Sequence, residues 1–296
     1  MPLRHDMRRG ALMMLGATAC FALMGVFVKI LSARLSFLEL MFFRNLLSLP
    51  VVLAAGLGTG ALLRTRRLGG HALRALSGMM GMGCAFLALT LLPLAEQTAL
   101  NYTQPLFIIL LSIPWLGERP GVMRWAAVGI GFLGVLVIAA GQGMGQGAGA
   151  WAGGPAAGYA IAALGGFFGA LSTMLVRQLS ATEPSTTIVL WQALMMTGMS
   201  ALGLPFVWVT PGWGELGLLL AMGLVGGVGQ VLNTEAFASA QASSLGPYTY
   251  SGLLWAGLLG WLVWGEAPGA AMLAGSALIV GAGFLVLRGE FGRGKA

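Results

Sequence analysis

The chain repeats itself at a spacing of 148 residues, which is half of its 296. Residues 101–141 read NYTQPLFIILLSIPWLGERPGVMRWAAVGIGFLGVLVIAAG, and residues 249–289 read TYSGLLWAGLLGWLVWGEAPGAAMLAGSALIVGAGFLVLRG. Each copy has two apolar runs around a Gly-Glu-x-Pro turn, at 117–120 and 265–268, and Tyr102 aligns with Tyr250. Apolar composition alone gives chance matches of Ala, Leu and Gly, but not this tyrosine pair and this turn pair. The chain therefore consists of two copies of one sequence unit.

The repeated unit has the composition of a membrane protein. Hydrophobic residues make up 57% of the chain and charged residues 8%, whereas soluble domains carry about 25% charged residues. A membrane-spanning helix needs about 20 apolar residues. The sequence predicts an all-α integral membrane protein with ten transmembrane helices, at 11–31, 36–57, 71–92, 96–115, 121–140, 157–178, 185–208, 216–238, 244–264 and 268–287.

The N-terminal segment resembles a signal peptide, because arginines precede an apolar run. That run continues from Ala11 to about Val28, which is too long for the apolar region of a signal peptide. We interpret it as a retained first helix.

An odd number of helices in each half requires the second half to insert upside down. Such inverted repeats surround a central cavity, with the substrate site near the membrane midplane. We expect a first five-helix repeat at 1–140, a Gly-rich extracytoplasmic linker at 141–155 and a second, inverted repeat at 156–296. One chain holds a complete pathway in this arrangement, so we expect a monomer.

Basic residues predict the orientation of the helices. With the N-terminus inside, 13 of the 16 lysines and arginines fall on the inner side, including the loop group Arg64, Arg66, Arg67 and Arg74. The outer side then holds Lys29 and Arg34, and Arg44 lies within a helix. The positive-inside rule predicts a multi-pass protein of the cell (inner) membrane with both termini cytoplasmic.

Several classes of function are excluded by the residues present. The net charge of +7 comes from residues in gaps between apolar runs, so it indicates topology rather than nucleic-acid binding. The two cysteines lie in apolar runs, while His5 and His71 lie in a tail and at a helix edge. We therefore expect no metal site, no catalytic group and no histidine proton relay. The glycine runs 78–83 and 223–229 follow no strand, so they favour close helix packing over a nucleotide-binding loop, and no cofactor is expected.

The turn pair, the glycine-punctuated helix after it and the doubled ten-helix plan resemble the drug/metabolite transporter superfamily, EamA type. The resemblance covers about residues 10–290 and is nearest to bacterial amino-acid exporters, including those of aromatic amino acids. It implies a carrier of small metabolites that works by alternating access. It also implies a cavity lined by the first, third, fourth, sixth, eighth and ninth helices, and no cofactor.

Polar residues inside apolar segments are the candidates for substrate contact. Gln230 and Asn233 are three residues apart and share a helix face, so they are our leading candidates, with helix–helix packing as the alternative. Arg44 is a candidate clamp for a carboxylate; the alternatives are pairing with Glu39 and snorkelling to the outer face. The repeat places Gln192 at the position of Arg44, and Trp191 precedes it.

The fourth predicted helix carries a polar group, namely Asn101, Tyr102 and Gln104, beside Pro105. Pro105 removes one backbone hydrogen bond, which a helix tolerates where it lines a cavity. In the inverted half, Tyr248 and Tyr250 lie in the matching segment. We predict that Pro105 and these tyrosines gate the cavity from opposite sides; interfacial tyrosines are the alternative.

These observations favour a secondary transporter of small metabolites. A lining of amides, phenols and methionines suits a small zwitterion such as an amino acid, and the resemblance favours export. The alternatives are transport of drugs or neutral metabolites such as nucleosides, and lipid flipping. A membrane enzyme would need a cluster of His, Asp, Glu or Cys, which the sequence lacks.

Overall fold

The computed structural model describes residues 7–57, 63, 65–104, 106–108, 110–111, 122–141, 155–180, 182–239, 248 and 250–293. All regular structure in these residues is helical. The helices are α1 (Met7–Leu31), α2 (Phe37–Leu57), α3 (Leu68–Leu91), α4 (Leu94–Asn101), α6 (Val122–Gly141), α7 (Pro155–Ser180), α8 (Ser185–Val207), α9 (Trp213–Ser239), α11 (Ser251–Trp264) and α12 (Ala270–Arg293). They follow the predicted segments, except that α4 and α11 are shorter.

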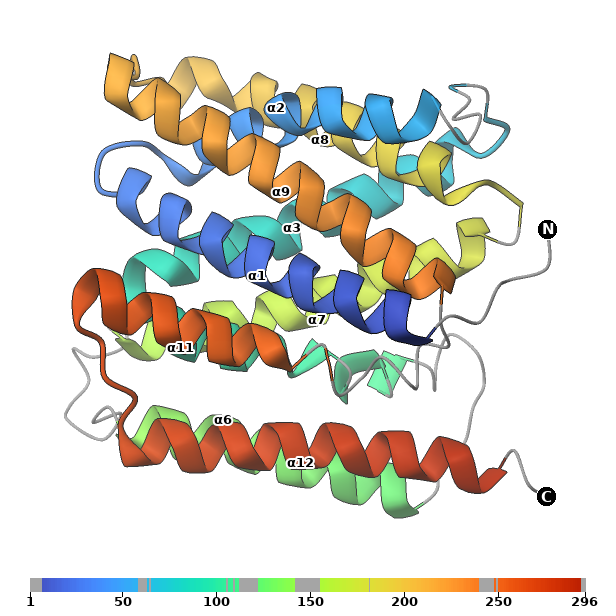
Figure 1. Ribbon diagram of the computed structural model, residues 1–296, viewed down its shortest axis with the longest axis vertical. Helices are drawn as coiled ribbons and strands as arrows, with labels where there is room; N and C mark the ends of the chain where they lie inside the picture. Colours follow the sequence, from blue (N-terminus) through green and yellow to red (C-terminus); the bar gives the residue numbers. More distant parts are fainter. Residues whose placement is uncertain are drawn as a thin grey trace.

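The 148-residue spacing reappears in the positions of the helices. Helices α1 and α7, α2 and α8, and α6 and α12 cover residues that are 148 apart, and α2 begins at residue 37 where α8 begins at residue 185. Figure 1 shows that α1 runs away from the side of the bundle where both chain termini lie, whereas α7 runs toward that side. The repeated elements are therefore inverted in space. We call that side the termini end and the opposite side the far end.

One helix is interrupted, and another begins at the equivalent position of the second half. Helix α4 ends at Asn101, Tyr102 and Thr103 form a turn, and helical structure resumes at Gln104. The turn is closed by short-range bonds, from Tyr102 N to Ala99 O and from Thr103 N to Leu100 O. In the second half, α11 begins directly after the turn residue Tyr250. A proline two residues after such a turn cannot donate a backbone bond; Pro105 itself lies outside the described residues.

Most helix packing joins one half of the chain to the other. Helix α1 packs on α9 and α11, and α3 packs on α7; α6 packs on α12, and α2 packs on both α8 and α9. These contacts interleave the two halves, so the core of the bundle belongs to both. Relative movement of the halves must therefore occur along these shared seams.

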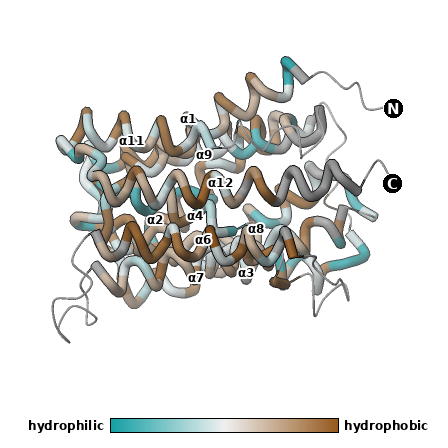
Figure 2. Tube along the Cα trace, turned by 90° about the horizontal axis from the view of Figure 1, so that it is seen from below, coloured by the Kyte–Doolittle hydropathy of each residue, from teal (hydrophilic) through white to brown (hydrophobic). Residues whose placement is uncertain are grey.

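The outer surface of the bundle is apolar. Trp213, Phe206 and Val122 are 92%, 87% and 86% exposed, which a protein in water would avoid on this scale. Figure 2 shows hydrophobic colour along the helices, with hydrophilic segments gathered mainly toward the two ends of the bundle. Six of the described helices are long and apolar enough to cross a membrane, and shorter apolar helices accompany them. This surface fits a membrane protein; ten complete crossings stay a prediction.

Charged side chains tie the helices together at the far end. Lys29, at the end of α1, pairs with Glu266 and lies 4.8 Å from the centre of the Trp264 ring. The same glutamate accepts a hydrogen bond from Leu94 N at the start of α4, at 3.1 Å. The second Gly-Glu-x-Pro turn therefore holds α1, α4 and α11 together through one carboxylate.

Glycines allow α6 and α12 to approach backbone to backbone. A methyl group added at Gly275 would lie 2.5 Å from the carbonyl oxygen of Gly134 and 2.5 Å from Ile138 Cγ1. Gly281, on the same helix, has nothing within 4 Å of such a methyl group. Close approach through small residues is the usual way in which helices associate in lipid.

We expect Gly275→Ala to lower the free energy of unfolding by about 1–3 kcal/mol, because the backbones must move apart. Gly281→Ala is the matched control, and we expect it to be neutral or stabilising by up to about 1 kcal/mol through helix propensity. Denaturation of both variants in detergent micelles measures the difference. Equal stabilities would show that the contact between Gly134 and Gly275 does not set the spacing of these helices.

Candidate functional site

The two repeat-related tyrosines meet in the structure. The ring centroids of Tyr102 and Tyr250 are 5.0 Å apart, at a tilt of 57°. Tyr102 follows the interruption of α4, and Tyr250 precedes α11, whose first turn lies about midway along the bundle in Figure 1. One aromatic pair, with one ring from each half, therefore lies where α4 ends and α11 begins. We call Tyr102 and Tyr250 the tyrosine pair.

Hydrogen bonds between the two halves surround the tyrosine pair. Thr18 Oγ1 of α1 lies 2.7 Å from Ser251 Oγ of α11, and Gln104 Nε2 donates to Thr173 Oγ1 of α7 at 2.8 Å. Glycine makes room beside one ring, since a methyl group added at Gly252 would lie 2.5 Å from the Tyr102 hydroxyl. Substrate recognition needs phenol, amide and hydroxyl groups of this kind, gathered at a break in two helices.

The positions of the predicted gating residues need one correction. We predicted that the tyrosines close a cavity from opposite sides, but the rings of Tyr102 and Tyr250 touch each other. Tyr248 packs elsewhere, against Met14 of α1 and Ala236 of α9. Asn101 ends α4, one residue before the tyrosine pair. Inverted repeats place equivalent residues on both sides of a shared axis, so equivalent residues near that axis come together.

Arg44 and Gln192 occupy equivalent places on opposite sides of the bundle. A methyl group added at Gly226 would lie 3.3 Å from Arg44 Nε, and one added at Gly78 would lie 3.2 Å from Gln192 Nε2. Both pairs differ by 148 residues (44 and 192, 78 and 226), so the predicted equivalence holds in space. Each side chain rests on a glycine of the other half.

The predicted alternative of an ion pair between Arg44 and Glu39 is wrong. The Glu39 carboxylate accepts hydrogen bonds from the backbone N–H groups of Ser36 and Val209, at 2.9 and 2.7 Å. Arg44 is 6% exposed and donates through Nη1 to Asn45 Oδ1 at 3.0 Å. Glu39 therefore fixes the ends of two helices, and Arg44 stays buried beside an amide.

Gln230 and Asn233 lie on α9 in one stripe with Gly226 and Gly229, because these positions recur every three or four residues. The glycines of this stripe face α1 and α2; a methyl group added at Gly229 would lie 3.0 Å from Cys20 Cβ. Both polar side chains are half-buried. The stripe faces the seam of α1, α2 and α9, whereas the tyrosine pair lies between α4 and α11.

Trp191 lies in a polar network at the termini end. Its indole Nε1 donates to Leu63 O at 3.2 Å, and its ring lies 6.0 Å from the ring of His71. His71 Nε2 lies 2.6 Å from Glu183 Oε2, and Thr65 donates to the other oxygen of that carboxylate. Burial alone would raise the pKa of Glu183, but the hydrogen bonds from Thr65 and His71 outweigh it and hold the pKa below its ordinary value. Trp191 is thus part of a junction between α3 and the α7–α8 connection.

Sequence reasoning missed two buried charged residues. Glu96, 4% exposed, accepts a hydrogen bond from Tyr159 of α7 at 2.7 Å. Arg74, counted among the loop arginines, lies within α3 and is 6% exposed. A charged residue inside an apolar segment is a functional candidate by default. Both were overlooked because each lies within two turns of a helix end, where the sequence suggests an interfacial position.

Comparison with known proteins gives the relatives of the chain. Residues 8–140 and 156–288 each match the EamA-like transporter family. The riboflavin transporter of Rhizobium johnstonii is 31% identical over 96% of this chain and 92% of that protein. The pseudopaline exporter of Pseudomonas aeruginosa is 30% identical over 93% and 94%, and the S-adenosylmethionine uptake transporter of Rickettsia bellii is 26% identical over 90% and 88%.

A crystal structure with 24% sequence identity superposes with a TM-score of 0.64 over 94% of this chain and 96% of the other. That likeness shows the shared fold. None of the three named relatives is described as an amino-acid exporter, so the finer resemblance to amino-acid exporters stays a prediction.

We expect Glu183→Gln to lower the melting temperature at pH 7 by about 2–4 °C, because the variant loses charge-assisted hydrogen bonds. A carboxyl group whose pKa is lowered on folding stabilises the protein above its unfolded pKa, and this contribution is lost as the pH falls through the folded pKa. The difference between wild type and variant should therefore shrink as the pH is lowered toward 3. Thermal unfolding at stepped pH measures it.

Glu235→Gln is the control, because the Glu235 carboxylate is 43% exposed and lies 3.8 Å from Arg9, where an ion pair contributes little. A Glu183→Gln variant that matches wild type at pH 7 would contradict the structural role of this junction.

Proposed function

The chain belongs to the EamA-like transporter family, whose members are transporters rather than enzymes, and from that premise we propose that it moves its substrate past the tyrosine pair by alternating access. It is a membrane-embedded, multi-pass carrier of small molecules. We propose the fuller architecture as well: ten crossings in two inverted five-helix repeats, joined by the linker at 141–155 around a central cavity. Both termini then face the cytoplasm, and one chain suffices.

The observation that carries this proposal is the contact between Tyr102 and Tyr250, at the end of α4 and the start of α11. A helix interrupted within a membrane protein leaves backbone groups that a polar substrate can satisfy. The contact joins the first half to the second, so rocking of the halves opens or closes it. A substrate bound beside this pair is therefore exposed to one side of the membrane at a time.

We propose amino acids as the first substrates to test. The polar groups beside the tyrosine pair are an amide and hydroxyls, and they match the hydrogen-bonding groups of a small zwitterion. The relatives widen the choice, because they are named for riboflavin, pseudopaline and S-adenosylmethionine. Neutral metabolites such as nucleosides, drugs and lipids are the remaining candidates. Export is the proposed direction.

The test is transport by the purified protein in proteoliposomes. Labelled amino acids, riboflavin and S-adenosylmethionine are offered separately, with and without a proton gradient. We expect one of these solutes to be taken up. Gln104→Ala and Tyr102→Leu should each lower its initial rate about tenfold or more, since each removes a hydrogen-bonding group at the site. Gln230→Ala and Asn233→Ala test whether the α9 stripe shares in binding.

Leu202→Ala is the matched control, because Leu202 is 78% exposed on the lipid-facing surface. Its rate should equal that of wild type. If uptake persists in Tyr102→Leu and Gln104→Ala, the substrate does not bind at the tyrosine pair, although the protein is still a carrier. Failure of every offered solute would contradict the proposed substrate class.

A further inference from the structure

Unsatisfied buried polar atoms concentrate at one seam of the bundle. In the part of the chain that the structure describes, six buried side-chain nitrogens and oxygens have no hydrogen-bond partner. Four of them belong to Arg74 (Nε and Nη1), His71 (Nδ1) and Thr187 (Oγ1). These residues are 6%, 1% and 1% exposed. Leaving such groups unpaired is costly, so their concentration at one place calls for an explanation.

The three residues lie on the faces of α3 and α8 that meet. His71 and Arg74 are three residues apart on α3, and Thr187 and Trp191 are four apart on α8, so each pair shares a helix face. The two faces meet because the rings of His71 and Trp191 are 6.0 Å apart. One turn beyond Arg74, Gly78 lies against Gln192 of α8. Arg74 therefore lies between two contacts of the same seam, near the termini end.

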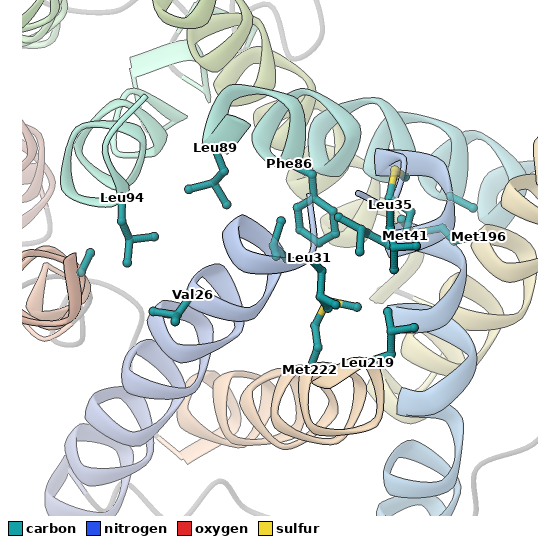
Figure 3. Packing of buried hydrophobic residues seen from close by; sticks show 14 residues of the cluster. Val26, Leu31, Leu35, Met41, Phe86, Leu89, Leu94, Met196, Leu219 and Met222 are labelled. Atoms are coloured by element: carbon teal, nitrogen blue, oxygen red, sulfur yellow. The ribbon is translucent and has the colours of Figure 1, made fainter. Parts of the chain in front are cut away.

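The repeat supplies a comparison within the same molecule. The equivalents of Glu183, His71 and Arg74 are Leu35, Leu219 and Met222, each 148 residues away. All three belong to the apolar cluster at the far end, where they are 3%, 0% and 0% exposed. Figure 3 shows Leu219 and Met222 reaching from α9 into that cluster.

At the far end, the equivalents of Glu183, His71 and Arg74 are thus all apolar. The equivalent of Thr187 is Glu39, which is 0% exposed and accepts hydrogen bonds from the backbone N–H groups of Ser36 and Val209. An apolar residue, Met222, fills the position of Arg74 there, so the architecture does not require a buried arginine at this place. A buried guanidinium with unpaired nitrogens lowers stability relative to an apolar residue of similar length. Such a group is best explained by a ligand that pairs with it part of the time.

We propose that Arg74 and Thr187 form an oxyanion site, which holds the carboxylate or phosphate group of the transported solute at the termini end of the pathway. Guanidinium N–H groups and a hydroxyl are donors, and an oxyanion accepts from both. His71 adjoins the site and is held by Glu183 through Nε2. The inference rests on the carrier function proposed above and narrows its substrates to anions and zwitterions, which include amino acids.

The first test is the stability of Arg74→Met, which installs the residue of the equivalent position in the other half. Without any ligand, we expect its melting temperature to rise by about 2 °C or more, because an unpaired buried charge is removed. Arg66→Met is the matched control, since Arg66 is an exposed arginine at the same end; its melting temperature should not change. A fall in the melting temperature of Arg74→Met would show a structural role and overturn the proposal.

The second test is binding of simple oxyanions to the purified protein in lipid-free detergent. Acetate and inorganic phosphate are titrated at constant ionic strength, with chloride as the reference salt. At least one should raise the melting temperature of the wild type and of Arg66→Met above that in chloride. In Arg74→Met the shift should vanish, and Thr187→Val should require about tenfold more anion, the effect of one lost hydrogen bond. Equal responses of wild type and Arg74→Met would overturn the site.

Comparison of the two anions identifies the chemical group that binds, and a transport assay distinguishes failure of the oxyanion site from failure of the proposed substrate class. A response to acetate alone assigns a carboxylate, and a response to phosphate alone assigns a phosphate. If amino acids are carried, Arg74→Met should raise their KM about tenfold or more; an unchanged KM overturns the inference and leaves the carrier function standing. If no amino acid is carried but the Arg74-dependent anion response persists, the oxyanion site stands and the choice of amino acids fails.

Discussion

Inside a membrane, a polar side chain must find its partner within the protein, because the surrounding hydrocarbon offers none. In this chain those partners lie across the repeat. Lys29 pairs with Glu266, His71 with Glu183, and Glu96 with Tyr159, and each pair joins the first half to the second. Polar contacts at the seams thus join the halves, beside buried apolar clusters that also contain residues of both halves, such as Leu31 and Met196. Any movement of one half against the other must exchange these partners.

Glycines lie at the helix contacts where buried polar side chains of one half meet the other half. Arg44 rests on Gly226 and Gln192 rests on Gly78, so long polar side chains lie flat against a helix that presents only backbone. Glycines at such a contact let the helices approach closely, which large interdigitated side chains prevent. The same glycines that were read from the sequence as packing residues also leave room for the buried polar groups beside them.

Much of the arrangement could be predicted from the sequence because the repeat carries it. The 148-residue spacing paired Gln192 with Arg44, and the structure places the two side chains equivalently. It did not reveal that Tyr102 and Tyr250 touch, since a spacing along the chain says nothing about distance from the axis that relates the halves. Glu39 and Arg74 were misread for another reason: their surroundings come from distant segments, here Val209 and the face of α8.

Alternating access requires two ends that can each close, with closure free energies that a solute can shift relative to each other. The repeat provides two ends of this kind. Equivalent helices give the two ends the same backbone plan, so either end can close. Their side chains differ, because the apolar residues Leu35, Leu219 and Met222 stand at the far end where Glu183, His71 and Arg74 stand at the termini end. The charged residues of the far end, among them Glu39 and the pair of Lys29 and Glu266, are bonded to partners within the protein. An apolar closure gains its free energy from packing alone and does not depend on a solute. If Arg74 binds the solute as we propose, the stability of the closed termini end depends on what pairs with that charge, so a bound solute shifts the balance between the two ends through the termini end.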